Sequence, residues 1–219
     1  MSLNVTDRRH VLIVAAGFAS GLVAFPWLPG PYIDREQSLF GSAVLFLFPR
    51  AVIAFLVPTA ALVICRVANT LLSRAVFGEP AAASTKAVQL ILLLTVLFVV
   101  VLHGLVLLSL VGFPIAQFLP HRLVVVLTGL LLVGIGNVLP RLRPNLVFGI
   151  RTRRLLENRV AWERVHRVAG YFAVAMGVIT VAAGLTLSKS QVPLVLSVAL
   201  VVGATVNVST YWKWTRAIR

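Results

Sequence analysis

Residues 137–170 read NVLPRLRPNLVFGIRTRRLLENRVAWERVHRVAG, and long apolar runs lie on both sides of them. The segment holds eight arginines but only two of the chain's six acids. Pro140 and Pro144 end a helix and favour an extended or turned backbone, because proline has no N–H and disfavours a helical residue before it. The segment therefore predicts a basic connector between two hydrophobic helices.

The composition indicates an integral membrane protein. Of 219 residues, 59% are hydrophobic and 12% charged, with a mean hydropathy of +0.99. Soluble domains carry about 25% charged residues, and so apolar a surface is stable only in lipid. The net charge of +14 comes mostly from residues that flank apolar runs, so we expect no direct contact with nucleic acid. The single Cys65 excludes an intrachain disulfide.

Six apolar runs are each long enough to cross a bilayer. About 20 helical residues span a core of about 30 Å, and these runs lack the alternation of barrel strands. We predict an all-α membrane protein with a bundle of six transmembrane helices, three in residues 1–121 and three in residues 122–219, which include the basic loop 140–167. The spans lie near residues 11–28, 44–65, 87–111, 123–139, 168–187 and 192–212.

Lysine and arginine predict the orientation of the bundle. With the N-terminus inside, 16 of the 20 basic residues fall in cytoplasmic segments and four fall outside. Because positive residues favour the cytoplasmic side, we expect both termini and the loop 140–167 there. The first run has no small-x-small cleavage site, so it is expected to remain as a span.

The end of the loop predicts a helix that starts before the fifth apolar run. Asn158 is a good N-cap, and the helix would continue from Arg159 into the membrane. Glu163 and Arg167 are spaced for an ion pair on this helix. Four residues at intervals of four share one of its faces: Asn158, Trp162, His166 and Gly170.

Small and polar residues inside the spans suggest packing contacts. Gly170, Gly177 and Gly184 recur every seven residues and predict close approach of a second helix. His103 is an ionisable group at membrane depth, so it is either functional or a neutral imidazole bonded to another helix. We expect Asn207 to bond to a neighbouring helix.

Three interpretations of the basic loop stay open. In the first, its arginines hold it on anionic lipid of the inner leaflet, at about 1 kcal/mol per residue. In the second, four side chains bind an anionic head group or an acidic partner: Asn145, Arg151, His166 and Arg167. In the third, His166 performs acid–base chemistry, although no nucleophile, acid cluster or phosphate-binding glycine loop accompanies it. We therefore assign no catalytic residue, cofactor or metal, and an enzyme is the less favoured class.

A longer pattern extends over residues 136–170. It consists of Gly136-Asn137, Pro140, Arg143-Pro144-Asn145, Gly149-Ile150-Arg151-Thr152, Asn158, Trp162, His166-Arg167 and Gly170. This pattern resembles the signature of the SdpI family of bacterial membrane proteins. Arg153-Arg154 stand where the family has Pro-Trp, which makes this loop more basic. The N-terminal half matches more weakly, at Leu28-Pro29, Pro31 and Gly41-Ser42.

The resemblance implies a six-helix protein of the bacterial plasma membrane that provides immunity to a secreted peptide toxin, relays a signal, or both. The toxin would meet the outer face, and anionic lipid or a soluble regulator would meet the loop. Two alternatives remain: a transporter or lipid-acting enzyme that uses the loop and His103, and a structural subunit of a membrane complex. The residues expected to bind are Asn137, Arg143, Asn145, Arg151, Thr152, Asn158, Trp162, His166 and Arg167.

Overall fold

The computed structural model of the chain describes residues 8–28, 50–72, 84–112, 120–188 and 190–216. The predicted outer loop 29–43, with most of the weaker N-terminal match, lies outside these residues. The described residues form helices and connecting turns, and no strand occurs among them.

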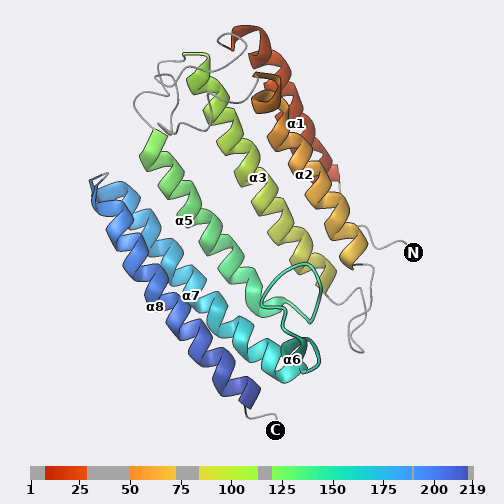
Figure 1. Ribbon diagram of the computed structural model, residues 1–219, viewed down its shortest axis with the longest axis vertical. Helices are drawn as coiled ribbons and strands as arrows, with labels where there is room; N and C mark the ends of the chain where they lie inside the picture. Colours follow the sequence, from red (N-terminus) through yellow and green to blue (C-terminus); the bar gives the residue numbers. More distant parts are fainter. Residues whose placement is uncertain (1–7, 29–49, 73–83, 113–119, 189, 217–219) are drawn as a thin grey trace.

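Long helices run side by side along the molecule, and successive ones point in opposite directions (Figure 1). They are α1 (Arg8–Ala24), η1 (Phe25–Trp27), α2 (Arg50–Leu72), α3 (Thr85–Leu110), α5 (Pro120–Val138), η5 (Leu139–Arg141), α6 (Arg153–Leu156), α7 (Arg159–Thr186) and α8 (Gln191–Arg216). Within the described ranges, six helices are long and apolar enough to cross a membrane. This confirms the predicted all-α class and the number of spans.

The predicted second span and helix α2 overlap over residues 50–65 but differ at their ends. We expected it near residues 44–65, but α2 runs over Arg50–Leu72. The prediction followed apolarity alone and stopped at Cys65. The helix continues past it and carries Arg66 and Asn69. The long side chain of Arg66 can reach toward the interface from within a helix.

The helices form a row in which sequence neighbours are also neighbours in space. α1, α2 and α3 pack together, α3 contacts α5, α5 packs on α7, and α7 on α8. The starts of α1, α3 and α7 lie at the same end of the bundle as the ends of α5 and α8 (Figure 1). Arg8, Lys86, Arg141, Lys213 and Arg216 belong to these helix ends, so this end is strongly basic. Its cytoplasmic location stays a prediction.

Paired glycines bring α5 and α7 into backbone contact. A Cβ atom on Gly177 would lie 2.6 Å from the carbonyl oxygen of Gly129, and one on Gly136 would lie 2.8 Å from that of Gly170. No side chain fits at these crossings, so the helices approach as closely as their backbones allow. The predicted close approach along the glycine stripe of α7 is confirmed.

His103 bonds to α2 one turn before the proline inside that helix. Its buried ring donates a hydrogen bond from Nε2 to the carbonyl oxygen of Ala54, at 3.0 Å. Pro58 follows four residues after Ala54 and has no N–H to offer that carbonyl. The imidazole therefore replaces the missing helical donor, and the predicted bond to another helix is present.

Asn207 was expected to bond to a neighbouring helix, and this expectation was wrong. Its side-chain amide donates to the carbonyl oxygen of Gly203 on its own helix, at 2.8 Å. The i−4 carbonyl is within reach of a short polar side chain, so the bond forms locally.

Candidate functional site

The basic loop is a folded structure, which we call the connector (residues 142–158). It leaves η5, runs without regular structure through residue 152, makes the single turn α6, and enters α7 at Arg159. Figure 1 shows it at the end of the bundle where α5 ends and α7 begins. The Asn158 Oδ1 atom accepts from the Ala161 N–H at 2.8 Å, which confirms the predicted N-cap of α7.

Asn145 folds the first turn of the connector. Its Oδ1 atom accepts from the N–H groups of Val147 and Phe148, at 2.9 and 2.8 Å. Its Nδ2 atom donates to the carbonyl oxygen of Arg143 at 2.8 Å. The side chain is 3% exposed, so its bonding capacity serves the turn itself.

Ser84, beside the start of α3, holds the connector against the N-terminal half of the chain. Its hydroxyl donates to the carbonyl oxygen of Arg143 and accepts from the N–H of the same residue, both at 2.8 Å. Ser84 is buried, so neither bond competes with water.

Ser84→Ala is expected to lower the free energy of unfolding by about 1–2 kcal/mol, because the partly buried N–H of Arg143 loses its acceptor. Thermal unfolding in a single detergent measures the change. Ser20→Ala is the matched control, because Ser20 donates only to the Gly17 carbonyl of its own helix, and a change within about 0.5 kcal/mol is expected. Equal losses in the two variants would contradict the role of Ser84.

Trp162 and His166 form a stacked pair beneath the connector. Both side chains are 0% exposed, and their ring centroids lie 4.0 Å apart at an interplanar angle of 21°. The indole Nε1–H of Trp162 donates to the carbonyl oxygen of Leu142 at 2.9 Å. The predicted shared face of α7 is therefore the face on which the connector packs.

Both ring nitrogens of His166 have partners inside the protein. Nε2 accepts from the N–H of Ile150 at 3.0 Å, and Nδ1 lies 2.9 Å from the carbonyl oxygen of Trp162. A carbonyl only accepts, so the proton is on Nδ1 and the ring is neutral. This arrangement leaves neither nitrogen for acid–base chemistry.

Gly149 lets the connector backbone reach His166. Its φ is +106°, a conformation that favours glycine, and a Cβ atom there would overlap the Nε2 atom of His166. The glycine thus places the N–H of Ile150 over the imidazole.

The acids of this segment are paired with three of its arginines. Glu163 accepts from Arg143 and, at 3.1 Å, from Arg159. Arg153 donates to Glu157 at 2.7 Å, a bond that raises the pKa of its guanidinium. The expected Glu163–Arg167 pair is replaced by the two bonds that Glu163 makes.

Most of the remaining positive charge is exposed. The guanidinium of Arg151 donates to the Leu146 carbonyl, and that of Arg164 lies 3.9 Å from the ring centroid of Trp214 on α8. Within residues 141–167, the arginines other than Arg143, Arg153 and Arg159 form no ion pair with any residue that the structure describes. Seven exposed side chains make up what we call the arginine surface: Arg141, Arg151, Arg153, Arg154, Arg159, Arg164 and Arg167.

The predicted site residues fall into two groups. Asn145, Trp162 and His166 are buried and bonded within the protein, and Asn158 caps α7. Thr152 precedes α6, and its buried Oγ1 atom has no bonded partner in the described part of the chain. Arg143 is partly exposed, whereas Asn137, Arg151 and Arg167 are exposed. The side chain of Asn137 bonds to the Val133 carbonyl of its own helix. Whether any of them binds a ligand stays a prediction.

The fold and the connector together define a multi-pass α-helical membrane protein whose basic connector packs on the helix that follows it. The SdpI/YfhL protein family model matches residues 141–210, which cover the connector, α7 and most of α8. These residues are therefore similar to the SdpI/YfhL family, as the resemblance indicated. No curated protein and no solved structure matches the chain.

Proposed function

We propose that this protein provides immunity to a secreted antimicrobial peptide toxin in the plasma membrane of a bacterium, and that its arginine surface contacts an anionic cytoplasmic partner. Support for the immunity role comes from the similarity of residues 141–210 to the SdpI/YfhL family. The partner is inner-leaflet lipid or the acidic surface of a soluble regulator. The proposal rests on one observation: buried contacts order the connector while its exposed side chains are largely guanidinium groups.

An ordered connector makes these guanidinium groups effective. Guanidinium binds carboxylate or phosphate through two parallel hydrogen bonds, which requires a fixed orientation of the donor. Arg151 is already oriented by its bond to the Leu146 carbonyl, and Arg164 by its position over Trp214. Less freedom is lost on binding when the donors are held in advance.

Arg151→Ala and Arg167→Ala are each expected to reduce the survival of cells exposed to the toxin about tenfold or more. Losing a charge-assisted contact of about 1.5–3 kcal/mol implies a change of that size. The measurement is survival of a deletion strain that carries each variant and is challenged with secreted peptide toxins. The amount of protein in the membrane should not change. Arg216→Ala, an exposed arginine at the end of α8, is the matched control and should protect fully.

His166→Ala separates the two groups of residues. It should also reduce protection, but by unfolding the connector, which faster trypsin cleavage after its arginines would reveal. Arg151→Ala should keep the trypsin rate of the unaltered protein. Full protection by both Arg151→Ala and Arg167→Ala would refute the role of the arginine surface. If the wild-type gene does not restore survival of the deletion strain under toxin challenge, the immunity proposal is refuted.

A further inference from the structure

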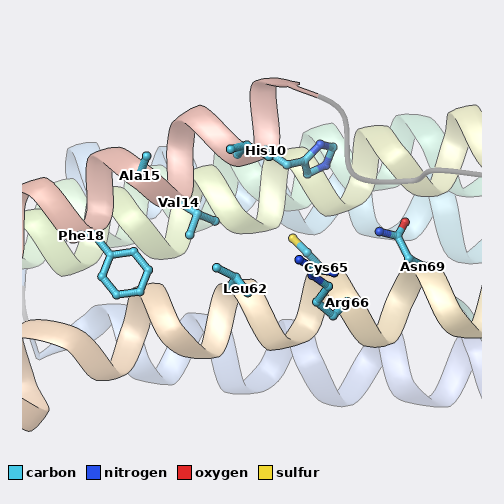
Figure 2. Close-up of a pocket in the computed structure, with 9 residues that line it drawn as sticks. His10, Val14, Ala15, Phe18, Leu62, Cys65, Arg66 and Asn69 are labelled. Carbon is cyan, nitrogen blue, oxygen red and sulfur yellow. The ribbon is translucent and has the colours of Figure 1, made fainter.

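A groove between α1 and α2 is separate from the connector. Its cavity volume is about 440 Å³, within the range of about 300–1,000 Å³ that is usual for ligand pockets. Figure 2 shows side chains of the two helices on opposite sides of it. The lining residues are His10, Val11, Val14, Ala15 and Phe18 from α1, and Leu62, Cys65, Arg66 and Asn69 from α2.

The groove has a polar end and an apolar end. His10, Arg66 and Asn69 gather at one end, whereas Phe18 and Leu62 lie toward the other (Figure 2). The buried His10 ring is held by a bond of 3.2 Å to the Gln89 carbonyl of α3. The lining includes a permanent cation and no acid. Such a division of polarity fits an amphiphile with an anionic head and a hydrocarbon chain.

The groove also has the depth of one leaflet. His10 lies in the first turn of α1, at the basic end of the bundle (Figure 1). Phe18 follows eight residues later, about 12 Å along the helix. A hydrocarbon core of about 30 Å gives each leaflet about 15 Å. The groove therefore follows a single leaflet from the head-group level toward the middle of the bilayer.

The charge of Arg66 is available to a ligand. Its side chain is exposed, and its guanidinium forms no hydrogen bond or ion pair with the residues that the structure describes. The acids that the structure describes, Glu157 and Glu163, are bonded to arginines at the connector. A packed apolar helix would bury this cation unpaired, whereas a phosphate would neutralise it through a bidentate bond.

We propose that this groove binds one anionic glycerophospholipid, with its phosphate on Arg66 and one acyl chain along Val14, Phe18 and Leu62. The lipid would seal the α1–α2 seam, which also contains the buried Cys65. The site is distinct from the arginine surface and does not depend on the immunity proposal.

Cys65 is the chain's single cysteine, so its alkylation reports occupancy of this groove alone. The protein is placed in nanodiscs of phosphatidylcholine, with increasing fractions of phosphatidylglycerol of the same acyl chains. Modification by N-ethylmaleimide is followed by intact mass. Phosphatidylglycerol is expected to slow alkylation about tenfold, in a saturable manner, because a charge-assisted phosphate contact is worth about that factor.

The variants test the assignment of the phosphate to Arg66. Arg66→Gln should lose the slowing, Arg66→Lys should restore part of it, and Arg216→Gln should behave as the unaltered protein. Equal rates in the two lipids, or slowing that persists in Arg66→Gln, would overturn the proposal. If Cys65 reacts in neither lipid, the second measurement is the amount of phosphatidylglycerol that stays bound to the protein after delipidation. Equal amounts on the unaltered protein and on Arg66→Gln would refute the proposal.

Discussion

Gly177→Ala is expected to lower the free energy of unfolding by about 1–3 kcal/mol, although alanine favours a helix over glycine by up to about 1 kcal/mol. The new Cβ atom would lie 2.6 Å from the carbonyl oxygen of Gly129 and 2.7 Å from the backbone N of Val133. Both atoms belong to the backbone of α5 and cannot rotate away. The two helices must separate, and the contacts along the seam weaken together.

Gly104→Ala is the matched control on α3, because a Cβ atom there would meet nothing within 4 Å. This variant should be neutral or gain up to about 1 kcal/mol from helix propensity. Thermal unfolding of both variants in the same detergent makes the comparison. If Gly177→Ala matches Gly104→Ala in stability, α5 and α7 do not meet at this glycine.

The α5–α7 seam illustrates what the sequence predicts of the fold. The spacing of Gly170, Gly177 and Gly184 predicts a small-residue stripe, but spacing on one helix does not identify its partner. That partner is α5, where Gly129 and Gly136 show the same interval of seven and cross Gly177 and Gly170. Helix number follows from the length of the apolar runs, since lipid requires about 20 residues per span.

Helix ends follow less well from apolarity. The second span shows why, because Arg66 and Asn69 are polar residues on a helix that extends to Leu72. The opposite case is α7, where the Asn158 cap fixes the start at Arg159, well before the apolar run at 168. A specific capping contact predicts a boundary better than average hydropathy does.

The structure shows how the predicted site residues are arranged, and their role in binding stays a prediction. Asn145 and His166 were expected to face a ligand, together with Arg151 and Arg167. In the structure the first two fold the connector, and the arginines stay exposed. Residue type and spacing show which face of α7 carries Trp162 and His166, but they do not show that residues 142–150 cover that face. Nor could spacing reveal Ser84, 59 positions before its partner Arg143.

Trp162→Ala is expected to be the most damaging single change in the connector, with a loss of about 3–5 kcal/mol. Its side chain is 0% exposed, stacks on His166 and donates to the Leu142 carbonyl, so the change leaves a cavity and an unpaired acceptor. Trp162→Phe keeps an aromatic ring and loses the N–H, so a smaller loss of about 1–3 kcal/mol is expected.

Thermal unfolding and trypsin cleavage after Arg151, Arg153 and Arg154 measure the effect of Trp162→Ala. Trp212→Ala on α8 is the control, because that indole is 45% exposed and its loss should change stability by less than about 1 kcal/mol. Similar losses at the two tryptophans would disprove the packing role of Trp162. Since Trp162 orders the connector, its loss should reduce toxin protection with every arginine intact, whereas Arg151→Ala should reduce protection with the packing intact. Only a site that needs both the charge and its fixed position predicts this pair of results.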